Sequence, residues 1–128
     1  MSYKKTTQDI TITVQPTAII EASEPEQKRF VFAYDVDIQN NSEQSLALLE
    51  RYWMVESNGI PVTEVVGPGV IGQLPVIKAG DSFNYQSSAV IEDPVGSMKG
   101  KYTFRRGDGT YITADIPDFD LLYNPMLH

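Results

Sequence analysis

Turn-forming residues recur along this chain at short intervals, and their spacing constrains the fold more than any other feature of the sequence. Gly adopts positive φ without steric cost, Pro fixes φ, and Asn and Asp tolerate the left-handed region. The segments between the turns are mostly near ten residues long, which is typical of strands in a β-sandwich or barrel. The turn clusters are Asn40-Asn41-Ser42, Asn58-Gly59, Gly67-Pro68-Gly69, Ala79-Gly80-Asp81, Asp93-Pro94-Val95-Gly96 and Gly107-Asp108-Gly109.

Apolar and polar residues alternate within these segments. Between Phe30 and Gln39 the even-numbered residues are large and apolar, whereas Asp35 and Asp37 occupy the other face. A period of two indicates a strand with one buried face. Shorter runs at 10–14, 83–86, 101–105 and 111–116 repeat this pattern with many β-branched and aromatic residues, which favour strands. The sequence therefore predicts an all-β protein.

Residues 43–56 fit two different structures. Leu46, Leu49 and Trp53 have the spacing of one face of a helix that Ser42 could cap. We favour a strand for the later part of the segment, because Asn58-Gly59 is a hairpin signal that leads into a second strand at 61–66. The strand alternative places one set of side chains on the same face: Leu49, Arg51, Trp53 and Val55.

The length of 128 residues indicates one domain. We expect it to occupy residues 1–128, with a core at about 10–118 and a C-terminal tail at 119–128. The segment after Ile116 contains Pro117 and Pro125, and proline cannot donate a hydrogen bond to a central sheet ladder. Four apolar residues of this segment are expected to pack on the domain, because exposing all of them would be costly: Phe119, Leu121, Leu122 and Leu127.

The composition excludes several kinds of chemistry. The chain has no cysteine, and its single histidine is His128, so a disulfide, a thiol nucleophile, a Cys/His zinc site and an internal Ser-His-Asp triad are ruled out. The net charge of -7 argues against a nucleic-acid partner, which requires clustered Lys and Arg. The N-terminus lacks the apolar run of a signal peptide, and no apolar stretch is long enough to span a membrane. We therefore expect a cytoplasmic protein without a membrane partner.

Residues 67–72 match the pattern G-x-G-x-x-G of dinucleotide-binding folds. That pattern functions between a strand and a helix, and Pro75 followed by Gly80 leaves no room for the helix. Two interpretations remain: a loop that bends closely at the end of a hairpin, which we favour, or an anion-binding nest of backbone N–H groups. The candidate anion site comprises Gly67, Gly69, Val70, Ile71, Gly72, Lys99 and Lys101.

The charges near the C-terminus are segregated. Residues 97–106 carry four basic residues and no acid, whereas residues 107–128 carry four aspartates and no Lys or Arg. The basic run is interpreted first as a solvated strand edge and second as a small patch for phosphate or an acidic partner. The Arg-Gly-Asp sequence at 106–108 is most simply part of a hairpin turn.

Carboxylates are the only candidate metal ligands. Asp35 with Asp37, Glu92 with Asp93, and Asp118 with Asp120 offer the oxygen atoms that magnesium or calcium prefers. An Asp-x-Asp pair on a strand is more commonly its solvated face, and EF-hand spacing is missing. We therefore predict no metal site, no cofactor and no catalytic residue.

The motifs of this chain, taken in order, resemble the bacterial ApaG family, which is also called CorD. The resemblance extends from Ile10 to the C-terminus. It is carried by Arg51-Tyr52-Trp53-Met54-Val55, Asn58-Gly59, residues 65–72, Pro75, Ala79-Gly80, Phe83, Tyr85, Ser87, residues 96–102 and Ile116-Pro117-Asp118-Phe119. It implies an immunoglobulin-like or fibronectin type III-like β-sandwich. It also implies that Gly67, Gly69 and Gly72 lie on a loop described in that family as similar to a pyrophosphate-binding loop.

The resemblance further implies an association with cobalt tolerance and magnesium efflux. Related eukaryotic domains look like interaction modules, so the expected function is non-enzymatic binding of an unidentified protein partner, with an indirect link to divalent-cation homeostasis. The alternative is binding of phosphate, pyrophosphate or a nucleotide polyphosphate at the Gly-rich loop. A homodimer through sheet edges is compatible with the sequence, although no single feature predicts it.

Overall fold

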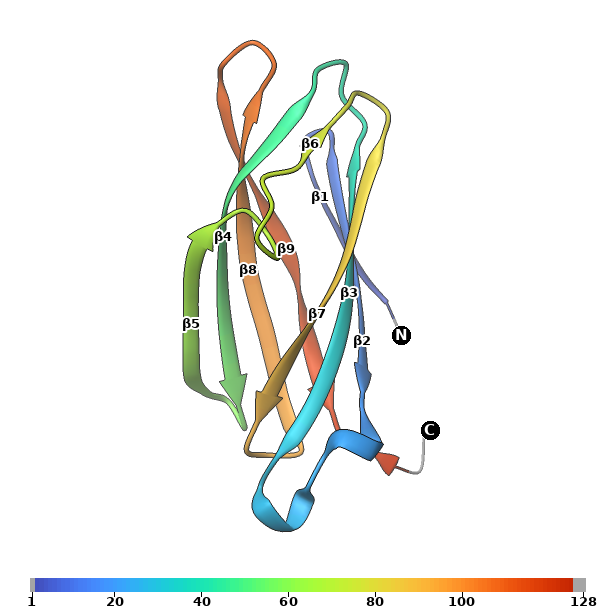
Figure 1. Ribbon diagram of the computed structural model, residues 1–128, viewed down its shortest axis with the longest axis vertical. Coiled ribbons are helices and arrows are strands. Elements are labelled where there is room, and N and C mark those ends of the chain that lie inside the picture. The colour runs from blue at the N-terminus through green and yellow to red at the C-terminus, as the bar shows by residue number, and fades with distance from the viewer. Residues whose placement is uncertain (1, 126–128) are drawn as a thin grey trace.

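The computed structural model describes residues 2–125, and these residues form two antiparallel β-sheets packed face to face (Figure 1). The sheets have the strand orders β1-β2-β3-β7 and β5-β4-β8-β9, and the short strand β6 pairs with the start of β4. This arrangement confirms the expected all-β sandwich of the immunoglobulin and fibronectin type III kind. The strands are β1 (Tyr3–Thr7), β2 (Ile10–Ala18), β3 (Phe30–Asn40), β4 (Leu46–Ser57), β5 (Ile60–Pro68), β6 (Val76–Ile77), β7 (Ser82–Ile91), β8 (Val95–Arg106) and β9 (Tyr111–Leu122).

The alternating sequence pattern builds the core. Every even-numbered residue of β3 from Phe30 to Asn40 is buried, and the odd-numbered residues are half-buried. Ile10, Ile12 and Val14 of β2 lie on the same inner face. Because side chains alternate across a strand, one face of each sheet is apolar and the two apolar faces pack together.

Residues 46–57 form strand β4, so the strand interpretation of this segment is confirmed and the helix is not. A bulge between Leu48 and Glu50 changes which residues face inward. Before the bulge Leu46 and Leu48 are buried, and after it Trp53 and Val55 are buried. One extra residue therefore lets a sequence with mixed periodicity present apolar side chains to the core on both sides of the bulge.

The segment expected to be a tail from residue 119 is instead the end of β9, which continues to Leu122. The pairing of β8 with β9 shifts register between Met98 and Gly100, opposite Pro117. The shift turns Phe119 and Leu121 into the core. Leu122, which was also expected to pack on the domain, is instead 52% exposed because it lies on the outer face of β9. Pro117 is tolerated because β9 is the last strand of its sheet and the proline lies at the irregularity. The predicted packing of Leu127 lies outside the described residues.

Ahead of residue 10, β1 adds a strand at Tyr3–Thr7 that pairs with β2, although none of its residues is buried. On this side the sandwich is closed by contacts between β1 and β9. The Lys5 Nζ lies 3.5 Å from the Asp115 carboxylate, and the Asp115 N–H donates to Thr7 Oγ1 at 3.4 Å. We call this side the closed flank.

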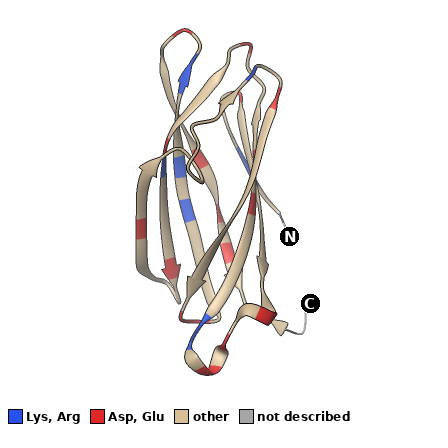
Figure 2. Cartoon of the chain, in the orientation of Figure 1, with Lys and Arg blue, Asp and Glu red and all other residues tan. Residues whose placement is uncertain are grey.

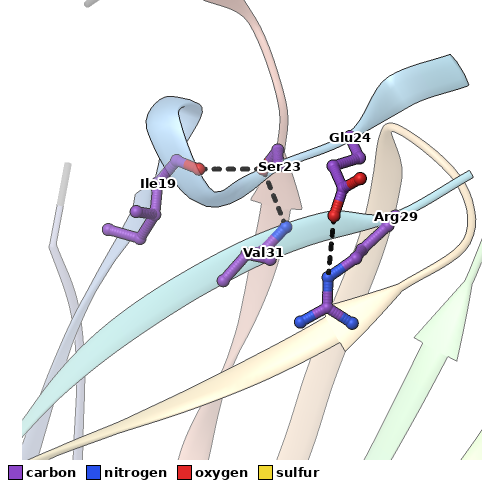
Figure 3. Close-up of polar contacts among 5 residues, drawn as sticks. All are labelled: Ile19, Ser23, Glu24, Arg29 and Val31. Carbon is purple, nitrogen blue, oxygen red and sulfur yellow. Dashed lines mark hydrogen bonds and ion pairs between the residues drawn. The ribbon is translucent and has the colours of Figure 1, made fainter. Parts of the chain in front are cut away.

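Two short 3₁₀ turns, η1 (Ile20–Ala22) and η2 (Pro25–Gln27), connect β2 to β3 across one end of the first sheet. Ser23 holds this connection: its hydroxyl donates to the Ile19 carbonyl at 2.8 Å and accepts from the Val31 N–H at 2.9 Å (Figure 3). Arg29 and Glu24 form an ion pair beside it at 3.9 Å. None of the helical segments among residues 2–125 has the length or apolarity to cross a membrane.

Candidate functional site

The Gly-rich segment is a tight hairpin placed directly after β5. The Val70 N–H donates to the Gln73 carbonyl at 2.9 Å, and the Gln73 N–H donates back to the Val70 carbonyl at 2.8 Å. Ile71 and Gly72 form the turn between them, with φ of 42° and 76°. Two successive residues with positive φ define a type I′ turn. The favoured interpretation, a loop that bends closely, therefore describes the geometry of this segment.

Close contacts constrain two of the glycines, Gly69 by the backbone and Gly67 only by a side chain. A Cβ atom on Gly69, whose φ is 57°, would lie 1.8 Å from the Gln73 carbonyl oxygen. A Cβ atom on Gly67 would lie 3.1 Å from Nη1 of Arg51. The glycine pattern thus allows the hairpin to fold back on itself and lets a guanidinium group lie close to the β5 backbone.

Some of the N–H groups of this segment are used inside the protein. Gly69 donates to the Leu49 carbonyl at 2.9 Å, Val70 donates within the hairpin, and Pro68 has no N–H. Within residues 2–125, the turn residues Ile71 and Gly72 have no hydrogen-bond acceptor for their N–H groups. The segment therefore offers two adjacent free donors at its tip.

Lys99 and Lys101 lie on the outer face of the second sheet. Lys99 Nζ is 3.5 Å from the Glu56 carboxylate, and Lys101 Nζ lies 5.7 Å from the centre of the Tyr52 ring. Figure 2 shows basic residues along β8 in this sheet. The Gly-rich hairpin, in contrast, folds toward the inner face, where Val70 is fully buried. The structure consequently does not bring the two lysines and the hairpin together.

The hairpin instead borders a cleft between the two sheets. The cleft has a volume of about 390 Å³ and opens between β5 and β7, on the side opposite the closed flank. We call this side the open flank. Val70 and Ile71 contribute the hairpin's part of the wall. Apolar side chains dominate the lining, which also includes Trp53, Val55, Val65, Ala89, Val90 and Met98.

Arg51 is the only charged residue of the cleft lining, among the residues that the structure describes. Its Nη1 donates to the carbonyl oxygens of Pro68 and Gly69 at 2.9 and 3.1 Å. No ion pair to Arg51 forms within residues 2–125. A guanidinium has five N–H donors, so Nε and Nη2 remain for a ligand.

Tyrosine and serine side chains supply the remaining polarity of the cleft. Tyr34, Tyr85, Ser87 and Ser88 line it together with Thr63. Burial raises the pKa of Tyr34 and of Tyr85. Hydrogen bonds to Ser87 and Tyr102, respectively, and the nearby Arg51 charge only partly offset this effect. Both phenols are therefore neutral at physiological pH and can act as hydrogen-bond donors.

A second candidate surface is the edge of the second sheet. Strand β5 is the last strand on this side, and most of its residues are exposed. Large apolar side chains gather along β5, the hairpin and β6. We define them as the edge strip: Ile60, Val62, Val66, Ile71, Leu74 and Val76, each more than half exposed.

The remaining sequence candidates have structural explanations or remain separate. The Arg-Gly-Asp sequence forms part of the β8–β9 hairpin, where the Gly109 N–H donates to the Arg106 carbonyl. The Thr110 side chain and N–H donate to Asp108 and lower the pKa of its carboxyl. No cluster of three or more His, Cys, Asp or Glu side chains suited to a metal ion occurs in the described part of the chain.

Arg51 was missed as a site residue by the sequence reasoning. The signal was present, because the strand alternative placed Arg51 on the same face as Trp53 and Val55. A charged residue on an otherwise apolar face is more informative than an exposed apolar residue.

These features define a two-sheet β-sandwich with an open cleft and an apolar edge on one flank. A family model described as the ApaG domain matches residues 20–106. The chain is 41% identical over 119 residues to Protein ApaG of Maricaulis maris. The matched region covers 93% of this chain and 92% of that protein. It is 40% identical over 116 residues to Protein ApaG of Proteus mirabilis, with coverage of 91% and 93%.

The fold matches as well. The crystal structure of the putative ApaA protein from Bordetella pertussis superposes with a TM-score of 0.87 at 33% sequence identity, covering 91% of this chain and 95% of that one. The chain belongs to the ApaG family, as the resemblance of its motifs predicted.

Proposed function

We propose that this protein is a non-enzymatic binding module whose edge strip accepts an extended segment of a partner protein. The observation that carries the proposal is the exposure of apolar residues on a free strand edge. Ile60, Val62 and Val66 of β5 are exposed by 63%, 54% and 61%. An exposed edge with apolar side chains invites pairing with another strand, and folded proteins usually protect such edges.

The hairpin supports the same function. Ile71 is a β-branched residue with φ of 42°, and its side chain is 54% exposed. A β-branched residue pays a steric cost at positive φ, so its presence at an exposed tip indicates a benefit outside the folded chain. Contact with a partner supplies that benefit.

The mode that fits this surface is β-augmentation. In this mode, backbone hydrogen bonds to a free edge give affinity, and contacts of alternate side chains give specificity. Glu64 is the only charged residue on β5, and its carboxylate accepts a hydrogen bond from the Tyr52 hydroxyl at 3.0 Å. The net charge of -7 disfavours a second copy of this chain as the occupant. The partner segment is therefore apolar, with a basic residue opposite Glu64.

Phosphate or polyphosphate binding would need Gly67, Gly69, Val70, Ile71 and Gly72 at one place with the two lysines of β8. Their positions on different faces of the sheet favour the protein partner over this alternative. The link to cobalt and magnesium homeostasis that the family resemblance implies would then pass through the partner protein.

Site-directed photo-crosslinking in cells tests the proposal. A crosslinking residue at Val66 is expected to capture a reproducible partner, whereas the same residue at exposed Tyr111 on β9 serves as the matched control. The captured protein is then purified and titrated against the full chain. Val66→Lys is expected to weaken its binding at least about tenfold, and hydrogen exchange is expected to slow at β5 amides in the complex.

Three results would contradict the proposal. The first is a Val66 adduct pattern identical to that of Tyr111. The second is equal affinity of the purified partner for Val66→Lys and for the native chain. The third is an adduct that contains only a second copy of this chain, which would replace the partner by a homodimer through sheet edges.

A further inference from the structure

We infer that the cleft on the open flank is a binding site for a small amphipathic carboxylate, whose charged group pairs with Arg51 and whose apolar body contacts Trp53. This site is separate from the edge strip, although Ile71 belongs to both. The inference depends on the charge of the cleft, the free donors of Arg51 and the apolar lining.

The charge of the cleft selects an anion. Among the described residues that line it, Arg51 is charged and none is acidic. A cleft lined by a basic residue and no acidic one is unusual in a chain with 17 acidic and 10 basic residues. A half-buried cation without an acidic partner is favourably paired by an incoming negative charge, since electrostatic attraction is stronger away from bulk water.

The geometry of Arg51 selects a carboxylate. Both N–H groups of Nη1 are used by the Pro68 and Gly69 carbonyls, which hold the guanidinium beside Gly67. No acceptor within residues 2–125 takes the Nε and Nη2 donors, and this edge matches the two oxygens of a carboxylate in a bidentate pair. Arg51 balances the single negative charge of a carboxylate. It leaves one charge of a dianionic phosphate without a partner.

The walls of the cleft select an apolar body. Trp53 lines the cleft with only 3% of its surface exposed, and its ring is held by Phe119 and Tyr34 at centroid distances of 5.9 and 5.3 Å. Val65, Ala89 and Met98 continue this apolar lining. A volume of about 390 Å³ is in the range of small-molecule sites, which are mostly apolar with few polar groups that fix orientation.

The fluorescence of Trp53 provides the test, because the chain has one tryptophan and it lines the cleft. The purified full chain is titrated with octanoate, 1-octanol, acetate and inorganic phosphate, and heats are measured in parallel by calorimetry. Octanoate is expected to produce a saturable change. Octanol, which lacks the charge, is expected to bind about tenfold or more weakly, and acetate and phosphate are expected to produce no saturable change.

Two variants locate the site. Arg51→Met retains an apolar stem and is expected to weaken octanoate binding about tenfold or more, with exposed Arg105→Met as the matched control. Ala89→Leu narrows the cleft without altering Arg51, and it is expected to abolish binding. This second variant decides the question if loss of Arg51 unfolds the hairpin.

The inference is overturned if octanoate gives no saturable change, or if octanol binds as tightly as octanoate. It is also overturned if Ala89→Leu binds octanoate like the native chain, or if phosphate alone saturates the site. Val66→Lys is expected to leave octanoate binding unchanged, which separates this site from the partner surface on β5.

Discussion

The hydroxyl groups of Tyr85 and Tyr102 are hydrogen-bonded to each other across the interior of the sandwich. Tyr85 extends from β7 of the first sheet, and Tyr102 extends from β8 of the second. Tyr102 has no solvent exposure, so this hydroxyl depends on its partner for a hydrogen bond. The pair therefore links the two sheets by a polar contact within an apolar core.

A double-mutant cycle on this pair is expected to show strong coupling. Tyr85→Phe leaves the Tyr102 hydroxyl buried without its partner and is expected to cost about 1–3 kcal/mol in free energy of unfolding. The double variant, in which both hydroxyls are absent, is expected to cost less than the sum of the single variants. Urea unfolding of the four proteins measures the coupling, and additive effects would show that the contact is energetically unimportant.

The same pair predicts how stability depends on pH. Burial raises the pKa of Tyr85 and of Tyr102 above the usual tyrosine value of about 10. Below that value both residues are protonated in the folded and unfolded chains, and their stabilising contribution is constant. Above it the unfolded chain loses protons that the folded chain retains, so stability falls by at most about 1.4 kcal/mol per pH unit for each residue.

Tyr102→Phe is therefore expected to reduce the slope of this loss. Unfolding free energies of the native chain and the variant are compared from neutral pH to beyond pH 10, the usual tyrosine pKa of about 10. Tyr111→Phe is the control, because its side chain is 66% exposed. Identical slopes for the native chain and Tyr102→Phe would contradict the expectation.

Substitution of Gly69 is expected to damage the fold far more than substitution of Gly59. Both glycines have positive φ, 57° and 79°, but a Cβ atom on Gly59 meets nothing within 4 Å. Gly59→Ala is expected to cost about 1 kcal/mol from its backbone conformation alone. Gly69→Ala adds a collision with the Gln73 carbonyl, and a cost of about 3 kcal/mol or more is expected. Thermal unfolding distinguishes the two, and equal midpoints would refute this account of the hairpin.

Ile71→Asn is expected to stabilise the protein by about 1 kcal/mol, because Asn tolerates positive φ and Asn-Gly is the preferred sequence of a type I′ turn. Ile60→Asn is the control. Ile60 is also more than half exposed, but it lies in strand β5 and does not have a positive φ. Chemical denaturation measures both. A native chain more stable than Ile71→Asn would mean that the Ile71 side chain stabilises the isolated fold.

Much of this fold follows from the sequence because period-two alternation is unbroken along several of its segments. Strand β3 and the hairpin at Asn58-Gly59, where Ser57 pairs with Ile60, are examples. Prediction was less complete where one extra residue shifts the alternation. At Leu49 the shift left a helix as an alternative, and at Pro117 it made the end of β9 look like a tail.

The candidate site was less predictable than the fold. The motif at 67–72 indicated a close-bending hairpin, but sequence spacing could not show whether Lys99 and Lys101 share its face of the sheet. That depends on how β4, β5 and β8 pair, and the pairing puts Arg51 beside the hairpin instead. Such placements come from long-range register, which local patterns do not encode.

The two flanks of the sandwich differ, because both proposed binding surfaces lie on the open flank and neither lies on the closed flank. The first strand, β1, belongs to the closed flank, where Lys5 meets Asp115, and β5 with the cleft belongs to the other (Figure 1). A tether attached ahead of β1 therefore holds the protein by its closed flank. The cleft and the edge strip then face away from the tether. Immobilisation through that end is the geometry in which both proposed sites can be assayed on one surface.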